Sequence, residues 1–600
     1  MILFDIEADG LLDTVKKIFC IWTYNTDTKE LAGYRPDEIT ECVRKLSEAT
    51  HNKTYVSAFN GFGYDFPVLF KLYPTVFKPN HNYLTDELLR ARLIFSDVYK
   101  QMDEDLIAKK KLPPSLGGAH SLKAWGKRLG VLKDEYEGGF DAFSEEMFEY
   151  CKQDVLVLKA VHAYLMKTAE MWANDESPCF KLEKSIRKII NGQENAGVYF
   201  DIPKALELTE ELTDKRAELK LYLQEMFGTF YTKGALFVPK KDSKVYWADA
   251  PLTKVEAVEF NPGSRHHIVS RIKAKYGHTF EEVTEKGNVK IDDDILEKLP
   301  YPEAKKLAEY MLLCKRIAAV STGDAAWLSL VDPVTSRISG KVNTQGTPTG
   351  RATHSAPNLA QIPAVRSAYG RQCRELFRAA PGKVLVGADL SGLELRCLGH
   401  YMYNYDDGEY IQELLNGDIH TKVQTLVGLP TRDAAKTLSY ALIYGAGDGK
   451  LGKLVGGGKE EGEDIRAKYM KGIKGFDRLC ADVQMVAKRR KALMGPDGRL
   501  MPVRAEYAAL NLLLQGCGGI ISKRAILEIH KLLRDTFKIY PYVQQVLWVH
   551  DEVVFETYEE HAETVGKACI QGFEQAGKEL NIKCPITGEW HVGATWADIH

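Results

Sequence analysis

The stretch RDAAKTLSYALIYGAG, residues 432–447, organises the rest of the chain. It is rich in Ala and Leu and therefore predicts one helix through residue 447. The polar side chains that recur at every fourth position are Arg432, Lys436, Tyr440 and Tyr444. Residues at this spacing share one side of a helix, and this side could hold a triphosphate at its cationic end and stack on a base at its aromatic end. Taken alone, such a pattern is more often a solvated charge pair followed by two core tyrosines, by about two to one.

Length and composition bound the fold and its surroundings. Six hundred residues exceed what one hydrophobic core usually serves, so at least two domains are expected. A net charge of −2 gives no global attraction to nucleic acid, and such binding must come from local basic faces. The eleven cysteines include no C-x-x-C pair and predict reduced core residues. The acidic N-terminus is unlike a signal peptide and no apolar run could span a bilayer, so we expect a cytoplasmic protein without membrane contact.

Acidic residues flank two apolar segments in the N-terminal part of the chain, and a later helix carries another. Asp5 and Glu7 stand at i and i+2 after an apolar strand and therefore point to one face, which suits hard cations. Asp65 follows a predicted turn and precedes an apolar run. A predicted helix further on carries Tyr150 and Asp154 on one face. Each feature by itself is more often structural than functional.

Together these features resemble the D-x-E, N-x(3-5)-D and Y-x3-D motifs of the proofreading 3′→5′ exonucleases, tyrosine subclass. The resemblance covers about residues 1–170 and implies an RNase H-like fold with two Mg²⁺ ions about 3.5–4 Å apart. It also implies that Tyr150 orients the attacking water. The implied metal ligands are Asp5, Glu7, Asp65 and Asp154.

The middle of the chain is helical and charged. Residues 203–228 and 301–320 are amphipathic runs and predict an antiparallel helix pair. Residues 229–290 lack a clear period, so strand or loop insertions are expected there. Four lysines make this insertion locally basic, either as a solvated face or as a contact for a nucleic-acid backbone. They are Lys233, Lys240, Lys241 and Lys244.

Two later segments place acids in apolar surroundings. Residues 383–400, KVLVGADLSGLELRCLGH, predict a buried strand that ends at Asp389 and leads into a helix, with Gly392 allowing close backbone approach. Residues 546–556, VLWVHDEVVFE, predict a hairpin with Asp551 at its tip. Acids concentrated in such settings are costly unless they are paired or bind metal. Asp389 and Asp551 are the pair that a two-metal nucleotidyl transfer needs.

These two segments and the opening helix resemble motifs A, C and B of family A DNA polymerases, the DNA polymerase I class. Residues 340–363, GKVNTQGTPTGRATHSAPNLAQIP, resemble the TGR…PNLQNIP segment of the same family. The likeness is strongest to the replicative members from bacteriophages of the T-seven group and spans nearly the whole chain. It implies a mixed α/β fold, with an exonuclease domain at residues 1–170 and a right-hand polymerase domain at residues 171–600. The implied subdomains are a thumb at about 200–325, fingers at about 410–500, and a palm from 326–409 and 501–600.

The resemblance also implies roles at the reaction centre. Asp389 and Asp551 would hold two Mg²⁺ ions together with the Leu390 carbonyl. Lys436 would bind phosphate and donate a proton to pyrophosphate. The other implied nucleotide contacts are His420 and Arg432 at the phosphates, Glu394 as a wall that excludes a 2′-hydroxyl, and Tyr440, which implies that dideoxynucleotides are accepted.

The implied DNA contacts lie on both sides of the new base pair. Arg351 would reach the minor-groove side of the primer–template duplex, where the acceptors are nearly independent of sequence. Tyr444 would stack at the templating site, and His550 would position the primer terminus. Asn511 and Gln515, at i and i+4, would contact minor-groove acceptors of the new pair.

The resemblance implies primer–template DNA and deoxynucleoside triphosphates as substrates and makes a replicative helicase-primase a candidate partner. If the chain is phage-encoded, its place is the cytoplasm of the infected bacterium. The thioredoxin-binding insertion of the phage members corresponds here to the much shorter residues 227–261, which argues against thioredoxin binding. Two rival functions are a repair or lesion-bypass polymerase and a non-catalytic nucleic-acid scaffold. A scaffold would be expected to lose metal ligands, and none is lost.

Overall fold

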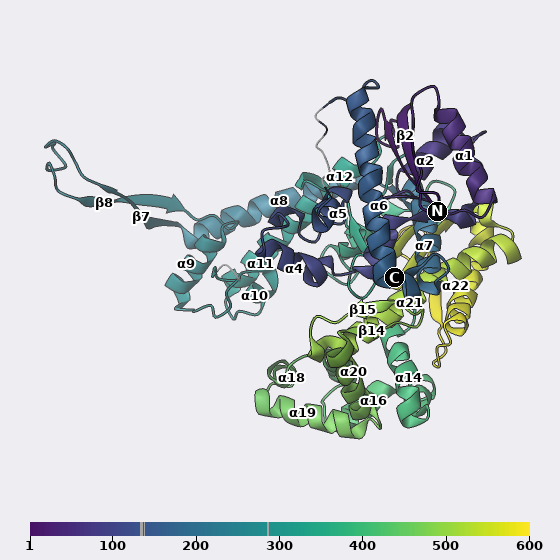
Figure 1. Cartoon of the computed structure of the whole chain (residues 1–600). Coiled ribbons are helices and arrows are strands. Elements are labelled where there is room, and N and C mark those ends of the chain that lie inside the picture. Colours follow the sequence, from purple (N-terminus) through teal and green to yellow (C-terminus); the bar gives the residue numbers. More distant parts are fainter. Residues whose placement is uncertain (132–135, 137, 285–286) are drawn as a thin grey trace. The chain divides into compact units, whose positions relative to one another are not determined.

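The structure is a computed structural model that describes residues 1–131, 136, 138–284 and 287–600. It divides into two compact units, each built from segments that are distant in the sequence (Figure 1). Unit 1 comprises residues 1–198, 339–361 and 379–600. Unit 2 comprises residues 199–338 and 362–378. No helix among the described residues is long and apolar enough to cross a membrane. All eleven cysteines are free, as the sequence predicts.

The N-terminal part of unit 1 contains a five-stranded sheet in the order β3-β2-β1-β4-β5. Strand β1 pairs antiparallel with β2 and parallel with β4. Its apolar residues enter different core clusters, because Leu3 packs with Trp22 whereas Phe4 packs with Phe66. Helices therefore cover both faces of the sheet. The strands are β1 Ile2–Ala8, β2 Ile18–Asn25, β3 Leu31–Tyr34, β4 Val56–Ala58 and β5 Leu84–Asp86, and the helices are α1 Ile39–His51, α2 Asp65–Leu72, α3 Glu87–Ile94, α4 Glu104–Ala108, α5 Leu122–Leu129, α6 Glu145–Ala173 and α7 Pro178–Ala196.

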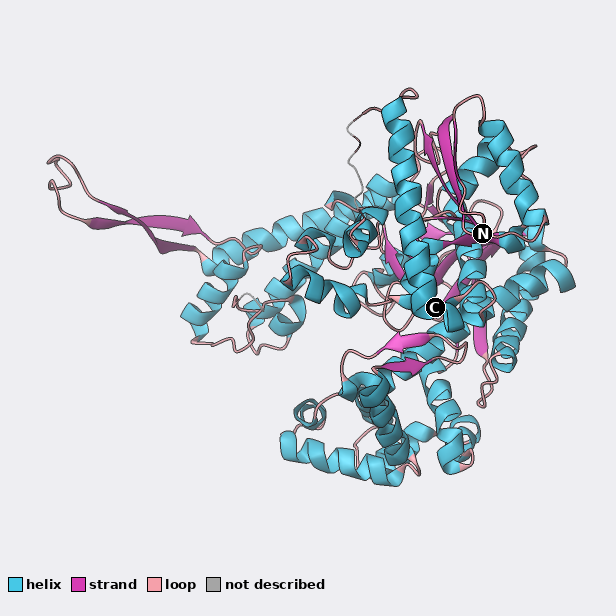
Figure 2. Ribbon diagram, in the orientation of Figure 1, coloured by secondary structure: helices cyan, strands magenta, loops and turns pink. Residues whose placement is uncertain are grey.

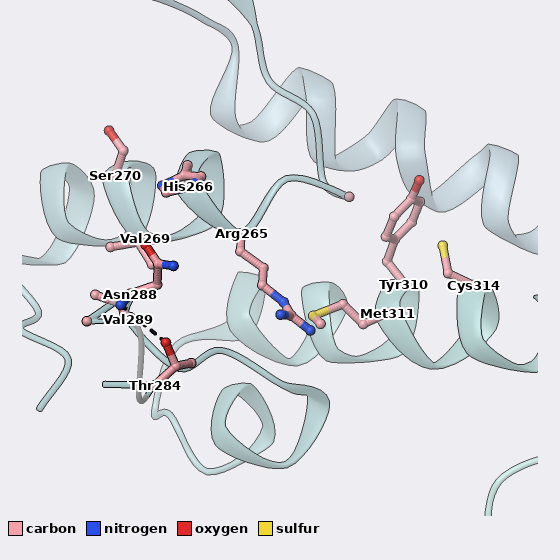
Figure 3. Close-up of a pocket in the computed structure, with 12 residues that line it drawn as sticks. Arg265, His266, Val269, Ser270, Thr284, Asn288, Val289, Tyr310, Met311 and Cys314 are labelled. Atoms are coloured by element: carbon pink, nitrogen blue, oxygen red, sulfur yellow. Dashed lines mark hydrogen bonds between the residues drawn. The ribbon is translucent and has the colours of Figure 1, made fainter. Parts of the chain in front are cut away.

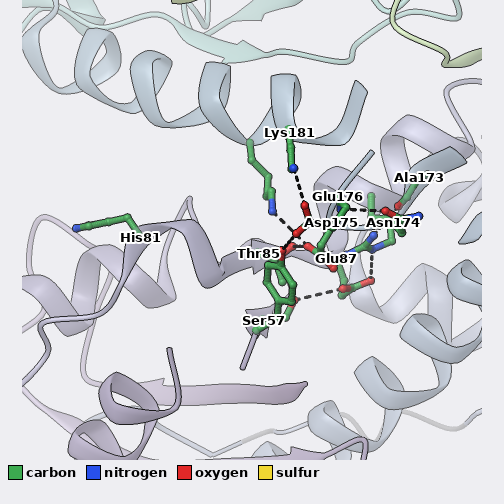
Figure 4. A network of polar contacts seen from close by, with 12 residues as sticks. Ser57, His81, Thr85, Glu87, Ala173, Asn174, Asp175, Glu176 and Lys181 are labelled. Atoms are coloured by element: carbon green, nitrogen blue, oxygen red, sulfur yellow. Dashed lines mark hydrogen bonds and ion pairs between the residues drawn. The ribbon is translucent and has the colours of Figure 1, made fainter. Parts of the chain in front are cut away.

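A buried polar network joins this sheet to the segment between α6 and α7 (Figure 4). Arg90 of α3 contacts Glu87 at 3.1 Å and Asp175 at 2.7 Å. Ser57 of β4 donates a hydrogen bond to Glu87 at 3.3 Å, and Thr85 of β5 donates one to Asp175 at 2.6 Å. Both charges of the Arg90–Glu87 pair are fully buried, so removing Glu87 would leave the buried Arg90 with Asp175 as its remaining acidic partner in this network.

The second sheet of unit 1 is antiparallel, in the order β16-β17-β13-β18. Helix α22 packs on β13 and β18 and also on the long helix α21. The predicted strand and helix around Asp389 and the predicted hairpin around Asp551 are both confirmed. The elements are β13 Val384–Leu390, β16 Val543–Val549, β17 Glu552–Thr557, β18 Gly588–Gly593, α14 Leu393–Asp406, α21 Ala509–Lys531 and α22 Glu559–Glu579, with the small hairpins β10 Lys341–Asn343 with β11 Thr353–Ser355 and β14 Ala492–Met494 with β15 Leu500–Pro502.

Helices α15 to α20 form the remainder of unit 1 and share the hydrophobic core of the second sheet. The helix predicted to run to residue 447 is shorter, because α17 ends at Ile443 and Tyr444 is its C-cap. Gly445 follows with a φ of 74°, a left-handed conformation that favours glycine and ends the helix. The helices are α15 Glu409–Asn416, α16 Ile419–Val427, α17 Arg432–Ile443, α18 Asp448–Leu454, α19 Lys459–Gly472 and α20 Phe476–Arg490.

Unit 2 contains the predicted antiparallel helix pair, in which α8 leads out to a hairpin and α11 returns (Figure 1). The predicted insertion is a β-hairpin of β7 and β8, shown as a two-stranded ribbon in Figure 2. Helix α9 lies in the same insertion and was not predicted. The elements are α8 Ile202–Phe227, β7 Thr229–Phe237, β8 Leu252–Glu259, α9 Arg265–Tyr276, α10 Asp293–Glu297, α11 Pro302–Ile317, α12 Trp327–Leu330 and α13 Gly370–Glu375, with a three-stranded sheet of β6 Val198–Phe200, β9 Arg337–Ile338 and β12 Phe377–Arg378.

Candidate active sites

The second sheet of unit 1 brings together the two acids predicted for nucleotidyl transfer. Asp389 lies near the end of β13, opposite Glu552 of β17 and Glu589 of β18. Asp551 lies in the turn between β16 and β17, and its carbonyl accepts a hydrogen bond from the Leu390 amide at 3.3 Å. The ends of three neighbouring strands therefore gather acidic residues at one edge of the sheet.

The local electrostatics favour a cation at this edge. Loss of hydration, and then the charges of Asp551, Glu552 and Glu589, raise the pKa of Asp389 to about 7. Burial also raises the pKa of Asp551, although the charge of Arg351 opposes this effect. Crowded carboxylates of this kind repel one another unless a cation or a proton compensates them. The oxygen donors present fit a hard divalent ion such as Mg²⁺.

A cavity of about 260 Å³ beside these acids collects five of the predicted residues. Glu394 of α14 lines this cavity and bridges two partners. It accepts a hydrogen bond from the Arg351 guanidinium at 3.0 Å and another from the Tyr444 hydroxyl. Residues predicted from three separate motifs thus meet in one hydrogen-bonded group. The five predicted residues that line the cavity are Arg351, Glu394, Tyr444, His550 and Asp551.

Two glycines of α21 also line this cavity and were not predicted as site residues. A Cβ at Gly519 would lie 3.2 Å from the Cγ of Arg351, and a Cβ at Gly518 would lie 3.2 Å from the Cδ2 of Leu393. The absence of side chains therefore lets the Arg351 stem lie directly across the helix. The available sequence signal was three glycines within four residues of an otherwise apolar helix.

The predicted phosphate-binding residues lie on α16 and α17. Arg432 forms an ion pair with Asp418 at 2.6 Å, and Asp418 caps α16 by accepting a hydrogen bond from the His420 amide at 3.0 Å. Burial, and then the charges of Arg432 and Lys436, lower the pKa of His420. Lys436 itself is exposed. Asp418 was not predicted as a site residue, and the structure identifies it as the group that holds Arg432.

The remaining predicted polymerase residues are placed by their own elements. The half-buried Tyr440 lies with its ring centroid 6.1 Å from that of Tyr444. Asn511 and Gln515 are half-buried on α21, and the Asn511 Oδ1 accepts no hydrogen bond from any described residue. His550 has a φ of 58°, and its carbonyl accepts hydrogen bonds from Ser522 at 2.9 Å and from the Trp548 indole at 3.1 Å.

The first sheet holds a second acidic centre. Ligand atoms of Asp5, Glu7 and Cys151 all lie within 4.8 Å of one another. Cys151 follows Tyr150 on α6 and was not predicted. Burial raises the pKa of the Cys151 thiol well above its ordinary value, so it stays neutral beside Asp5 and does not add a charged ligand. The carboxylates remain the groups that fit a hard cation.

Asp65, the first residue of α2, lies against the backbone of β1. It is buried and accepts a hydrogen bond from the amide of Ile6, the residue between the two acids of β1. Burial raises the pKa of Asp65 to about 7. Its neighbour Asp86, also not predicted, accepts hydrogen bonds from the amides of Asn60 and Phe62, each at 3.1 Å. Asp86 therefore fixes the turn that leads into α2.

The last two predicted exonuclease residues are on α6, which packs on β1. Asp154 is buried, and Tyr150 lies one turn before it with its ring centroid 5.5 Å from that of Tyr136. The structure therefore brings the two acids of β1 together and places Asp65 against the β1 backbone between them. Tyr150 and Asp154 lie on α6, the helix that packs on β1.

A separate cavity of about 1200 Å³ lies in unit 2 beside α9 and α11 (Figure 3). Arg265 points into it from the start of α9, and Tyr310 and Met311 line it from α11. None of the predicted site residues lines this cavity. Its size alone therefore does not connect it with the chemistry of the two acidic centres.

Comparison with known proteins defines the class. Residues 245–598 match the profile of DNA polymerase family A, and residues 2–166 match that of the RNase H superfamily. The chain belongs to DNA polymerase family A and carries an RNase H-like exonuclease domain at its N-terminus. Members of these two families generally depend on divalent metal ions.

The particular relatives include the DNA-directed DNA polymerases of Escherichia phage T7 and Enterobacteria phage T3. Each is 34% identical to this chain over an alignment that covers 100% of both proteins. DNA polymerase I of Geobacillus stearothermophilus is 26% identical over 70% of this chain and 46% of its own length. A solved structure described as the POL domain of Pol1 from M. smegmatis in complex with DNA primer-template and dNTP has a TM-score of 0.74 at 17% identity, covering 99% of this chain and 96% of that one, and shows the shared fold. The predicted family and fold are confirmed.

Proposed function

We propose that this protein replicates DNA in a phage-type system and removes mismatched primer ends with its own 3′→5′ exonuclease. The observation that carries the proposal is the meeting of Arg351, Glu394, Tyr444 and His550 with Asp551 around one cavity. A structural role alone would not require a cationic, an acidic and an aromatic side chain to converge on a second acid. The separate centre at Asp5 and Glu7 supplies the hydrolytic function.

We propose that Asp389, Asp551 and the Leu390 carbonyl bind two Mg²⁺ ions at the polymerase centre. Bound metal would lower the pKa of the primer 3′-hydroxyl and neutralise charge on the triphosphate. The raised pKa of Asp389 supports this assignment, because the crowded acids gain most from a divalent cation. The protein's own contribution is to hold these oxygens at the ends of adjacent strands.

The incoming nucleotide is bound by residues of α16 and α17. Arg432, Lys436 and His420 hold the phosphates, and Lys436 protonates the leaving pyrophosphate. The ion pair with Asp418 keeps the Arg432 side chain in place before substrate arrives. Glu394 excludes a 2′-hydroxyl because it is already hydrogen-bonded to Arg351 and Tyr444 and cannot move aside freely. Tyr440 faces the 3′ side of the sugar.

The primer–template duplex is held from its minor-groove side. Arg351, Asn511 and Gln515 contact minor-groove acceptors, which differ little between base pairs. The buried Asn511 Oδ1, which accepts no hydrogen bond from any described residue, supports a polar ligand at this position. Tyr444 stacks at the templating site, and His550 positions the primer terminus.

At the exonuclease centre, Asp5, Glu7, Asp65 and Asp154 bind two Mg²⁺ ions, and Tyr150 orients the attacking water. The hydrogen bond from the Ile6 amide to Asp65 supports a shared site for the acids of β1 and α2.

The division into an exonuclease domain at residues 1–170 and a polymerase domain at residues 171–600 belongs to the same proposal. So do the subdomains: a thumb at about 200–325, fingers at about 410–500 and a palm from 326–409 and 501–600. A helicase-primase is the proposed partner, in the cytoplasm of an infected bacterium. The alignment with the phage T7 protein spans 708 positions whereas this chain has 600 residues, so at least 108 positions of it have no residue here. This difference supports the proposal that replication does not use thioredoxin.

One experiment tests the main assignments. Primer extension with Mg²⁺ is measured on matched and mismatched primer ends for the wild type, for Asp389→Ala, and for Asp5→Ala combined with Glu7→Ala. We expect Asp389→Ala to bind duplex without extending it, and the double variant to extend matched ends but to leave mismatched ends undigested. Synthesis by Asp389→Ala would refute the polymerase assignment. Unchanged digestion by the double variant would refute the exonuclease assignment. Adding candidate thioredoxins to each reaction, with product length as the readout, tests the partner proposal.

A further inference from the structure

The β7–β8 hairpin of unit 2 ends in an ordered loop, residues 238–249, which we call the hairpin tip. Its backbone is closed by a hydrogen bond from the Asp249 amide to the Pro239 carbonyl at 2.8 Å. Within it, the Ser243 amide donates to the Tyr246 carbonyl at 2.8 Å. These bonds hold the loop in one conformation, so its exposed side chains are presented without a large ordering cost on binding.

The charges of the hairpin tip are unevenly compensated. Lys240, Lys241 and Lys244 are exposed, and none forms an ion pair with any other residue that the structure describes. The Asp242 carboxylate accepts a hydrogen bond from the Ala248 amide at 2.7 Å and thus serves the loop itself. The tip contains three lysines and two aspartates and so has a net positive charge. The three ammonium groups are available to an anionic ligand.

Large apolar side chains are exposed beside these lysines. Trp247 is 79% exposed and Val245 is 76% exposed. Tyr246 is held in place because its ring packs edge-on against Phe237, with a centroid distance of 5.5 Å. An indole left in water beside a fixed neighbour offers a free flat surface on which another ring can stack.

The same apolar character continues along one face of the hairpin. Lys233 pairs with Val255 across the strands, so Tyr231, two residues before Lys233, lies on the Val255 side. Leu236 pairs with Thr253, which is two residues from Val255, so Leu236 shares that face. Tyr231, Leu236 and Val255 are 75%, 70% and 67% exposed. Because Lys233 lies on the same face, this face extends the mixed cationic and aromatic surface of the hairpin tip along the ribbon.

We propose that the hairpin tip binds single-stranded DNA, with phosphates on the three lysines and a base stacked on Trp247. Duplex DNA would offer phosphates to the lysines, but its bases are stacked inside the helix and could not reach the indole. A protein partner would cover the apolar face but would leave the lysines without a role. Cations interleaved with an exposed aromatic ring are the arrangement that binds unpaired strands irrespective of sequence. The inference rests on the proposed function, because templated synthesis exposes a single-stranded template.

The test uses the full chain with Asp5→Ala and Glu7→Ala, so that the strand is not digested. A circular oligonucleotide provides single-stranded DNA without ends, and a closed duplex of equal length provides the comparison. Binding is measured by fluorescence anisotropy across a series of salt concentrations. The variants are Trp247→Ala, Trp247→Phe and the triple variant Lys240→Ala, Lys241→Ala, Lys244→Ala. The matched control removes three exposed lysines elsewhere, with Lys567→Ala, Lys578→Ala and Lys583→Ala.

We expect Trp247→Ala to weaken binding of the circle roughly tenfold and to change duplex binding little, with Trp247→Phe close to the parent. The triple lysine variant should lower the slope of log K against log salt by about 2 for the circle, while the control triple variant leaves it unchanged. Unchanged binding of the circle by both hairpin variants would overturn the proposal. An equal loss for circle and duplex in Trp247→Ala would overturn it too, because base stacking would then play no part. Normal extension of a short primed template by these variants keeps this result separate from the polymerase assignment.

Discussion

The two acidic centres of unit 1 are built in opposite ways. At the proposed exonuclease centre, Asp5 and Glu7 lie on one strand, and the buried Asp65 accepts a hydrogen bond from the amide of Ile6, which lies between them. At the proposed polymerase centre, Asp389 and Asp551 come from segments far apart in the sequence and meet at one edge of a sheet, where Asp389 is exposed and Asp551 lines a cavity. The first centre is closed and depends on packing. The second is open and depends on charged side chains that a substrate can reach.

The open centre should be the more sensitive to removal of one charge. We expect Asp551→Asn to reduce primer extension by roughly a thousandfold or more, because several kcal/mol of charge stabilisation would be lost. Digestion of single strands should persist. Glu589→Gln is the matched control, since Glu589 also raises the pKa of Asp389 but is not a proposed ligand. Single-turnover extension measures both variants, and an equal loss in both would show that the centre needs negative charge rather than a particular ligand.

At the closed centre, loss of a carboxylate should affect digestion more than loss of the neighbouring thiol. We expect Asp65→Asn to lower 3′→5′ digestion roughly a hundredfold, because a buried metal ligand loses its charge while its hydrogen-bond acceptor remains. Cys151→Ala should stay within a fewfold of the wild type, since the thiol is neutral. Release of a labelled 3′ nucleotide measures both. A larger loss for Cys151→Ala than for Asp65→Asn would reverse the assignment.

The buried network around Arg90, in the same part of unit 1 as the closed centre, predicts a dependence of stability on pH. Burial by itself would raise the pKa of Glu87, but the charges of Arg90 and His162 outweigh it and lower that pKa to about 2. Because the folded pKa lies below the ordinary value of 4.5, the stabilisation is fully present above pH 4.5 and is lost as the pH falls towards 2. Its size is about 3 kcal/mol.

The free energy of unfolding in urea is measured between pH 7 and pH 3, with a probe that reports on the N-terminal RNase H-like domain. Glu87→Gln should lower stability by about 3 kcal/mol at pH 7 and flatten the pH dependence, because Arg90 would lose a buried partner. Glu176→Gln, which removes an exposed charge from the same network, is the control. A parallel pH dependence in wild type and Glu87→Gln would contradict the prediction.

Local patterns were sufficient to predict one part of the site. Asp5 and Glu7 share a face because strands alternate, and Asp389 and Asp551 end apolar strands, so both pairs follow from the sequence. The other residues of the polymerase site were predicted from the family resemblance, because no local pattern connects Arg351 with Glu394. The residues that the prediction missed either bind backbone amides or act by lacking a side chain. Asp86 holds a turn by accepting amides, and its role appears only once that turn is folded.

The errors have a physical cause of the same kind. The helix expected to reach residue 447 ends at Ile443 because Gly445 adopts a positive φ. The backbone conformation of a glycine cannot be predicted from the apolar helical pattern around it. Gly392 was expected to allow close backbone approach. A Cβ there would meet no atom within 4 Å, and its φ of 57° is the reason that glycine suits the position. Conformation at single residues therefore limited the prediction more than periodicity did.

A smaller effect is expected at the sugar side of the open centre. Tyr440→Phe should reduce incorporation of dideoxynucleotides relative to deoxynucleotides by about tenfold, because one hydroxyl interaction would be lost where the substrate lacks its own 3′-hydroxyl. Competition between the two nucleotide types on one template measures the ratio. Tyr444→Phe is the control, since its hydroxyl contacts Glu394 rather than the proposed position of the 3′-hydroxyl. An unchanged ratio in Tyr440→Phe would contradict the division of roles between the two tyrosines.

The smallest effect tests whether the open centre also depends on packing. A Cβ at Gly519 would lie 3.2 Å from the Arg351 Cγ, so Gly519→Ala must move the arginine stem by a few tenths of an ångström. The guanidinium would then shift relative to Glu394, and we expect a severalfold loss of extension with little change in stability. Gly449→Ala is the matched control, because a Cβ there meets no atom within 4 Å. If Gly519→Ala extends primers at the wild-type rate, the Arg351–Glu394 pair tolerates displacement. The open centre would then not depend on close packing, in contrast to the closed one. A severalfold loss in Gly519→Ala alone would show that the open centre also relies on close packing, where Gly518 and Gly519 of α21 line the cavity.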